Sequence, residues 1–299
     1  MTHCGFVAVL GAPNAGKSTL INDWVGAKVS IVSSKAQTTR SLIKGIAIHN
    51  DAQVILLDTP GIFKPKKRLE KAMVAAAWQG EAEADMLVLV VDASRKKLGQ
   101  ETNMILDKLV KQEEKRPCIL VLNKVDKAAK EELLLKAKEL NDRFPFSASF
   151  MISALKKNGS NDVLEYIADH LPESEWHYPE DQISDLPMRL LAAEITREKC
   201  FHKLHEELPY GLTVETENWE EFKDGSVKIS QIVYVGRESH KGIVLGKAGK
   251  QVKEIGALSR AELEEILERR VHLKIFVKVQ ESWQDDPEKY LIWGLDHSA

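Results

Sequence analysis

Short apolar runs alternate with amphipathic stretches along the first half of the chain. The apolar runs, each bounded by polar or turn-forming residues, span 5–10, 42–49, 53–58, 86–92, 118–122 and 148–152. Stretches between them, such as 100–113 and 127–143, place apolar residues on one helical face. Strands that alternate with helices form a mostly parallel sheet flanked by helices. We therefore predict an α/β domain over residues 1–172, with ligand sites at the carboxyl ends of its strands.

The pattern changes after residue 172. An acidic, proline-bracketed segment, 173–186, is predicted to be a linker. The elements expected beyond it are a helix over 187–207, strands over 211–222 and 226–236, a helix ending at Leu245, a helix ending at Arg270 and a strand over 271–279. This helix-strand-strand-helix-helix-strand order predicts a smaller α+β domain over 187–299. A chain of 299 residues has room for two such domains.

A glycine-rich segment directly after the first apolar run carries the strongest chemical signal. Residues 11–18 read Gly-Ala-Pro-Asn-Ala-Gly-Lys-Ser, which satisfies the pattern G-x-x-x-x-G-K-[ST]. The backbone N–H groups of such a loop surround a phosphate chain, its lysine contacts the β- and γ-phosphates, and its hydroxyl binds Mg²⁺. The residues predicted to bind phosphate are Gly11, Asn14, Ala15, Gly16, Lys17, Ser18 and Thr19.

Three further motifs each close a predicted strand and indicate the base. Asp58 to Gly61 place a carboxylate near Mg²⁺ and a backbone N–H near the γ-phosphate. Asn123, Lys124 and Asp126 follow, and a carboxylate at position 126 can accept two hydrogen bonds from guanine. Adenine lacks the 2-amino group and would leave that acceptor unpaired. The backbone N–H of Ala154, after Ser153, is expected to face guanine O6. Together with the glycine-rich loop, these motifs predict a P-loop GTPase.

The sequence defines the catalytic residues less fully than the nucleotide-binding motifs. A polar segment, 37–40, offers Thr38 and Thr39, one of which must reach Mg²⁺ and be released after hydrolysis. We favour Thr39, so that the predicted metal ligands are Ser18, Thr39 and Asp58, and the predicted catalytic residues are Lys17, Thr39, Gly61 and Asn14.

Ile62 follows Gly61, where Ras-like GTPases place the glutamine that orients water. An isoleucine cannot do this, so another side chain, a backbone carbonyl, a partner or a cation must contribute. Asn14 resembles the asparagine of potassium-activated GTPases, which helps to hold K⁺ beside the β- and γ-phosphates. The alternative is that Asn14 only tolerates an unusual backbone angle. Asp92 also ends a strand, but no phosphate motif surrounds it, and a plain polar strand terminus is the simpler interpretation.

The second domain carries a nucleic-acid motif. Gly246-Lys247-Ala248-Gly249 between two predicted helices is typical of the GxxG loop of a type II KH domain, which clamps about four nucleotides of single-stranded RNA. Basic residues gather around it, against Glu238 alone between 237 and 253. The residues predicted to bind RNA are Gly246, Lys247, Ala248, Gly249, Lys250, Lys253, Arg237 and Lys241.

Composition narrows the remaining choices. The net charge is −3, so RNA binding must come from a local patch. Cys4, Cys118 and Cys200 are scattered, which argues against zinc or disulfides and favours a reducing cytoplasm. The chain enters its first strand within a few residues, and no apolar run approaches the length of a membrane span.

A GTPase domain followed by a KH domain resembles the Era family of ribosome-associated GTPases over essentially the whole chain. The resemblance is carried by residues 11–18, 37–40, 58–61, 123–126, 153–154 and 246–249. It implies a monomeric factor for small-subunit assembly that binds GTP or GDP with Mg²⁺, and the 3′ end of 16S ribosomal RNA through the KH groove. GTP would favour RNA binding and hydrolysis would release it. The family is also associated with the inner membrane surface.

One alternative from another class stays open. The chain would then be an RNA-binding assembly or chaperone protein whose nucleotide site is mainly structural. A nucleotide-hydrolysing switch that controls RNA binding is favoured by Lys17, Ser18, Thr39 and Asp58. The absence of a glutamine after Gly61 keeps the alternative open.

Overall fold

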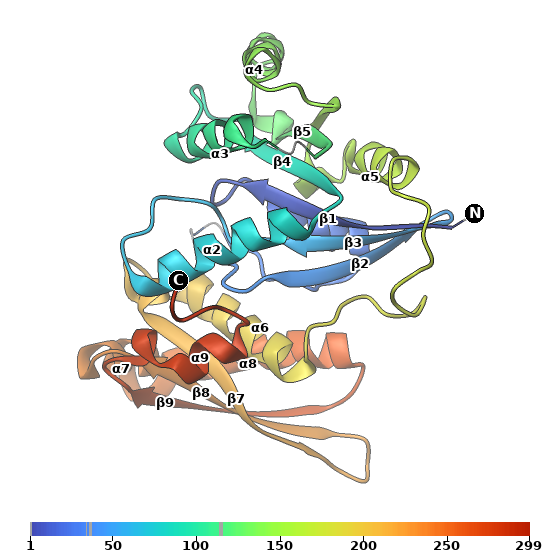
Figure 1. Cartoon of the computed structure of the whole chain (residues 1–299). Coiled ribbons are helices and arrows are strands. Elements are labelled where there is room, and N and C mark those ends of the chain that lie inside the picture. The colour runs from blue at the N-terminus through green and yellow to red at the C-terminus, as the bar shows by residue number, and fades with distance from the viewer. Residues whose placement is uncertain (1, 34, 36–37, 114–115) are drawn as a thin grey trace. The chain divides into compact units, whose positions relative to one another are not determined.

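A computed structural model describes residues 2–33, 35, 38–113 and 116–299 (Figure 1). The chain divides into two compact units, Met1–Asp185 together with Tyr290–Ala299, and Leu186–Lys289. This division differs from the predicted extent of the second domain, 187–299, because the last residues are grouped with the first unit. No helix among the described residues is both long enough and apolar enough to cross a membrane.

The first unit is built on a six-stranded sheet in the order β2-β3-β1-β4-β5-β6. Its strands are β1 (His3–Gly11), β2 (Ile43–His49), β3 (Ala52–Asp58), β4 (Met86–Asp92), β5 (Cys118–Asn123) and β6 (Ala148–Ile152). All neighbours are parallel except β2, which runs antiparallel to β3. The predicted mostly parallel sheet is therefore confirmed, and its strands end near the predicted positions.

Helices cover both faces of this sheet. They are α1 (Lys17–Val25), α2 (Arg68–Glu83), α3 (Gln100–Lys111), α4 (Lys130–Arg143) and α5 (Ser160–Asp169). Alternate residues of β1 point to opposite faces, so Val7 and Val9 join the core under α1 and α5, whereas Ala8 and Leu10 join the core under α3 and α4. Fully buried strands of this kind hold the motif-bearing loops at one edge.

The second unit contains a three-stranded sheet in the order β7-β8-β9. Its elements are α6 (Met188–Lys203), β7 (Leu212–Glu221), β8 (Val227–Val235), α7 (Glu238–Leu245), α8 (Lys250–Leu267) and β9 (Val271–Val279). The predicted element order is confirmed. Both long helices end earlier than predicted, because Leu204 is extended and Glu268 has the left-handed φ of +49°.

The ends of the second unit include elements that the sequence pattern did not predict. A single 3₁₀ turn, Trp283–Asp285, is followed by α9 (Pro287–Ile292), which reaches into the segment grouped with the first unit. Elements this short contain too few residues for a helical period to be recognised.

Candidate functional site

The four predicted motifs of the first unit meet around one cavity of about 450 Å³. It lies at the carboxyl ends of the parallel strands, as the strand pattern predicts. The predicted residues that line it are Asn14, Gly16, Lys17, Ser18, Thr19, Thr39, Gly61, Asn123, Lys124, Asp126, Ser153 and Ala154. Gly11, Ala15 and Asp58 do not line the cavity, and they act on its lining residues through hydrogen bonds.

The loop of residues 11–18 wraps the start of α1. Lys17 Nζ donates to the carbonyl oxygens of Gly11 and Ala12 at 3.1 and 3.2 Å. Burial lowers the pKa of this amine to about 8, although the nearby Asp58 carboxylate opposes the shift. Gly16 precedes the helix with φ +102°, and a Cβ there would lie 2.2 Å from Asn123 Nδ2. Glycine is therefore required where the loop approaches the base-recognition motif.

Three hydroxyl groups surround one oxygen of Asp58. Its Oδ2 accepts from Ser18 Oγ at 2.8 Å, Ser30 Oγ at 2.5 Å and Thr39 Oγ1 at 3.3 Å. Ser18 and Thr39 also lie 3.1 Å apart, hydroxyl to hydroxyl. Thr38 Oγ1 instead donates to the backbone oxygen of Lys35. The geometry thus brings Thr39, rather than Thr38, to the predicted metal ligands, while Gln37 of the same motif lies outside the described residues.

The Asp58 cluster fits a magnesium ion. The carboxylate is fully buried, and burial raises its pKa despite the hydroxyl bonds and the nearby Lys17. Its other oxygen, Oδ1, has no hydrogen-bond partner among the described residues. Carboxylate and hydroxyl oxygens are the donors that Mg²⁺ prefers, and a buried carboxylate gains from a cation nearby.

The predicted base-recognition residues are held by hydrogen bonds to one another and to the loop of residues 11–18. Asn123 Nδ2 donates to the Ala15 carbonyl at 2.9 Å, and Ser153 Oγ donates to Asp126 Oδ1 at 2.6 Å. Mainly through that hydroxyl bond, the pKa of Asp126 lies below its usual range. The Ala154 N–H, expected to face guanine O6, donates instead to Asn123 Oδ1 at 3.0 Å. A contact with O6 would have to share or replace this bond.

The predicted RNA loop has the backbone that its glycines suggest. Gly246 and Gly249 have φ of +68° and +74°, and Ala248 between them has +52°. Helix α8 begins directly after the loop, at Lys250. The side chains of Arg237, Lys247, Lys250 and Lys253 are exposed, and Lys241 is half-buried beside Glu238 at 3.9 Å.

A groove of about 260 Å³ adjoins that loop between α8 and β9. It is lined by Val252, Lys253, Gly256, Ala257, Arg260, Leu273 and Ile275. Of these, only Lys253 was among the predicted RNA-binding residues. The others carry no motif, but Gly256 and Ala257 are small residues one turn beyond Lys253, which leave the helix surface open.

Comparisons with known proteins decide the family. A family model for "50S ribosome-binding GTPase" matches residues 6–124, and one for "KH domain" matches residues 207–284. GTPase Era of Rhizobium meliloti (strain 1021) is 57% identical over 295 residues, which cover 99% of this chain and 93% of that protein. GTPase Era of Brucella suis biovar 1 (strain 1330) is 55% identical, covering 99% and 94%. The chain belongs to the Era family of GTPases.

Solved Era structures have the same fold. A crystal structure of an Aquifex aeolicus Era variant bound to GDP and AlF₄⁻ matches with a TM-score of 0.92 and 40% identity, covering 98% of this chain and 99% of that one. A structure of Era with MgGDPNP and nucleotides 1506–1542 of 16S ribosomal RNA gives the same values. The resemblance stated from the sequence motifs is confirmed.

Two residues show how this Era-family site differs from a Ras-like one. The side chain of Ile62 packs into the core of the first unit, and its N–H donates to the Gly11 carbonyl at 3.2 Å. It therefore contributes no polar group to the cavity. Asn14 lines the cavity and has φ of +64°, an angle that asparagine tolerates better than most residues. The backbone angle and a cation contact are both compatible with asparagine here.

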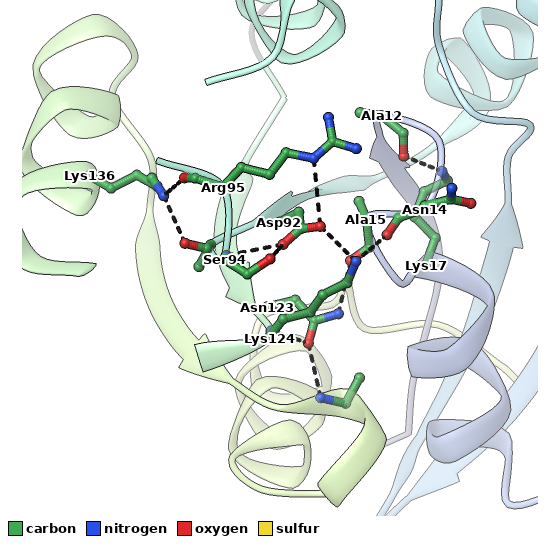
Figure 2. A network of polar contacts seen from close by, with 12 residues as sticks. Ala12, Asn14, Ala15, Lys17, Asp92, Ser94, Arg95, Asn123, Lys124 and Lys136 are labelled. Atoms are coloured by element: carbon green, nitrogen blue, oxygen red, sulfur yellow. Dashed lines mark hydrogen bonds and ion pairs between the residues drawn. The ribbon is translucent and has the colours of Figure 1, made fainter. Parts of the chain in front are cut away.

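Other residues of this Era-family site were missed by motif reasoning. Asp92 was interpreted as a plain strand terminus, but it lines the cavity and pairs with Lys124 (Figure 2). Ser30 donates to Asp58 although no motif contains it. Arg95 and Leu155 also line the cavity. Asp92 had one usable signal, its position at the end of a buried strand beside the one that precedes Asn123.

Proposed function

We propose that the chain is a GTP-binding and GTP-hydrolysing switch that binds single-stranded small-subunit ribosomal RNA through its second unit and acts in small-subunit assembly. One observation carries the proposal. The phosphate, metal and guanine motifs converge on one cavity, in a chain whose other unit presents a basic GxxG loop beside a groove. The solved Era complex with MgGDPNP and 16S nucleotides supports the pairing of these two activities.

The nucleotide step follows from the cavity. Lys17 and the backbone N–H groups of residues 14–19 would hold the phosphates, and Asp126 with Asn123 would hold guanine. Ser18, Thr39 and Asp58 would hold Mg²⁺, which neutralises charge on the phosphates as the transferred group departs. Thr39 connects metal binding to the segment before β2, so its release after hydrolysis would signal the nucleotide state.

The RNA step follows from the second unit. The glycines of residues 246–249 let a nucleic-acid backbone approach, and Lys247, Lys250 and Arg237 supply charge. The apolar floor of the groove, with Leu273 and Ile275 of β9, would receive unstacked bases. The exposed basic residues near one loop explain how a chain of net charge −3 can bind RNA.

Potassium stimulation is a further part of the proposal. A K⁺ ion held by Asn14 beside the β- and γ-phosphates would neutralise charge there, as an arginine finger does, in a site where Ile62 cannot orient water. Hydrolysis should then be faster in KCl than in NaCl of equal ionic strength, and Asn14→Gly should remove the difference while preserving the backbone angle. Equal rates in the two salts would exclude this role.

An RNA-binding assembly protein with a mainly structural nucleotide site remains the second candidate, because no glutamine follows Gly61. The Lys17→Ala variant distinguishes the two candidate functions. The switch requires that this variant lose nucleotide-dependent control of RNA affinity. The alternative requires that its RNA affinity stay unchanged.

The deciding experiment measures RNA affinity at fixed salt with GDP and with a non-hydrolysable GTP analogue. The RNA would end at the small-subunit 3′ terminus, with a scrambled sequence as control. Tighter, sequence-selective binding with the GTP analogue is expected. Equal affinity in both nucleotide states would overturn the switch, and equal affinity for both RNAs would overturn the assigned target.

Assembly state and location belong to the same proposal. The resemblance supports a monomer that contacts the small ribosomal subunit. The scattered cysteines, all three buried, support a cytoplasmic protein. Peripheral association with the inner membrane rests on the family resemblance alone.

A further inference from the structure

An ion-paired network at the end of β4 joins the two loops that would bind the nucleotide (Figure 2). Asp92 Oδ2 accepts from Lys124 Nζ at 2.6 Å, and the same Nζ donates to the Asn14 carbonyl at 2.6 Å. Lys124 belongs to the base-recognition motif and Asn14 to the phosphate-binding loop. One ammonium group therefore connects both ends of the cavity, and Asp92 supplies its negative partner.

Asp92 is itself held in place. Its second oxygen, Oδ1, accepts from the Ser94 backbone N–H at 3.0 Å and from Ser94 Oγ at 2.6 Å. Arg95 Nε lies 3.8 Å from Oδ2. Both carboxylate oxygens thus have fixed donors, and the side chain is only 13% exposed. Burial opposes ionisation of this carboxyl, but the Lys124 and Ser94 bonds outweigh it and lower its pKa.

The loop after Asp92 is anchored by a lysine of helix α4. Lys136 of α4 is buried, and its Nζ donates to the backbone oxygens of Ala93 and Arg95 at 2.8 and 2.5 Å. Figure 2 shows Lys136 on the opposite side of this loop from Lys124. Exposed ion pairs contribute little to stability. The Asp92–Lys124 pair differs from them, because Asp92 is mostly buried and Lys136 holds the loop that follows it.

We propose that Asp92 is a positioning residue that fixes the Lys124 ammonium against the Asn14 carbonyl and so sets the spacing of the base and phosphate loops before nucleotide binds. The inference rests on the proposed nucleotide site and adds a residue to it. A lysine side chain has high rotamer entropy, so an ammonium without this partner would have to be ordered when nucleotide binds. Asp92 removes that cost in advance.

The test measures affinity for GDP in variants of the full chain. Asp92→Asn keeps the side-chain shape and an acceptor for Ser94 but removes the charge that holds Lys124. Affinity is expected to fall by about tenfold, as loss of a charge-assisted hydrogen bond implies. Asp92→Glu, which restores the charge, should recover part of the loss. Asp107→Asn is the matched control, because it removes an ion pair with Arg143 on the outside of α3; it should bind GDP normally.

A double-mutant cycle shows whether Asp92 acts through Lys124. In a Lys124→Met background, Asp92→Asn should change GDP affinity less than twofold. The proposal would be overturned if Asp92→Asn lowered GDP affinity equally in the wild-type and Lys124→Met backgrounds. It would also be overturned if Asp92→Asn did not lower GDP affinity in the wild-type background. Thermal unfolding without nucleotide shows whether a variant loses GDP affinity because it is unfolded or because the Lys124 ammonium is displaced. If Asp92→Asn folds poorly, Ser94→Ala is the second variant, because it removes the Ser94 Oγ bond to Oδ1 but keeps the backbone N–H bond and the carboxylate charge. It should show a smaller loss of GDP affinity, and that loss should also vanish in the Lys124→Met background.

The assay contains no RNA, so its outcome is separate from that of the proposed switch. Nucleotide-independent RNA binding would overturn the switch and leave the Asp92 result standing. A failed cycle would overturn the role of Asp92 and leave nucleotide control of RNA binding untouched.

Discussion

One carboxylate, that of Asp126, lies in the part of the cavity that is predicted to bind the base. Ser153 fixes it through a 2.6 Å hydrogen bond, and Lys156 lies 3.9 Å from its other oxygen. Both contacts favour the ionised form, which is the form that accepts two hydrogen bonds from guanine. A motif of two or three letters is sufficient to find such residues, because their chemistry requires one residue type at one strand end.

Asp126→Asn is expected to change base selectivity. The amide presents a donor where guanine N1 and the 2-amino group need an acceptor, so GDP affinity should fall by about 100-fold or more. Xanthine offers an oxygen in place of the 2-amino group, and its nucleotides should bind better than GDP. Competition binding with GDP and XDP measures both effects. Tight, guanine-selective binding by the variant would contradict the assignment of Asp126.

The two neighbouring threonines provide a matched pair at the predicted metal site. Thr39 Oγ1 lies among the Asp58 and Ser18 oxygens, whereas Thr38 Oγ1 bonds the Lys35 backbone. Thr39→Ala should therefore weaken binding of a GTP analogue with Mg²⁺ by about tenfold and leave GDP binding nearly unchanged. Thr38→Ala should affect neither. The opposite pattern in nucleotide titrations would make Thr38 the ligand.

Residues without a motif escaped prediction at this scale. Ser30 reaches Asp58 only because the segment after α1 folds back, and Asp92 meets Lys124 only because β4 and β5 are neighbours in register. Both contacts depend on tertiary packing, and no local spacing encodes them. Alternation and turn chemistry, in contrast, were sufficient for most elements.

At the scale of elements, turns are well encoded and helix ends poorly. The Asp224-Gly225 pair, a typical hairpin-turn sequence, forms the turn between β7 and β8, with Gly225 at φ +82° and Asp224 Oδ1 accepting from the Ser226 N–H. Helix α6 stops at Lys203, four residues before the predicted end, and Glu206 shortly after it has a φ of +55°. Such an end has no glycine or proline to mark it, so the apolar pattern alone overextends the helix.

The GxxG loop and this hairpin turn allow a controlled test of RNA binding. Gly249 and Gly225 both have left-handed φ, of +74° and +82°, and a Cβ at either position would meet nothing within 4 Å. Gly249→Asp and Gly225→Asp should thus cost similar, small amounts of stability, about 1 kcal/mol. Only Gly249→Asp places a carboxylate where phosphates would approach. It should weaken RNA binding by at least tenfold at low salt.

Gel-shift or anisotropy titrations of both variants, with GTP hydrolysis measured without RNA, complete this comparison. Hydrolysis should be intact in each. Equal RNA affinity of the two variants would place the RNA elsewhere than at the GxxG loop.

At the scale of the whole molecule, each unit has its own hydrophobic core. Val9, Leu10 and Leu120 belong to clusters within the first unit, and Cys200 and Val233 to one within the second. The change of hydrophobic pattern near residue 172 was enough to indicate two domains. The assignment of residues 290–299 was beyond sequence reasoning, because it depends on contacts with residues distant in sequence.

Two buried cysteines can report on the two units separately. Cys118 lies in the first unit and Cys200 in the second, and burial raises the pKa of each thiol to about 12. Since burial shields each sulfur and disfavours the reactive thiolate, alkylation requires opening of the unit that contains the cysteine. GDP binds only the folded first unit in our proposal. At a concentration of 100 times its Kd, it should slow alkylation of Cys118 by about 100-fold.

Cys200 should react at the same rate with and without GDP, because the second unit contains none of the predicted nucleotide-binding residues. Mass spectrometry after timed alkylation at constant mild denaturant measures both cysteines in one sample, so each serves as the control for the other. Protection of Cys118 alone would establish that the units open independently and that the nucleotide site lies in the first. Equal protection of both thiols would instead mean that the chain opens as one cooperative unit. GDP binding would then stabilise the second unit, which is proposed to bind RNA, as well as the first.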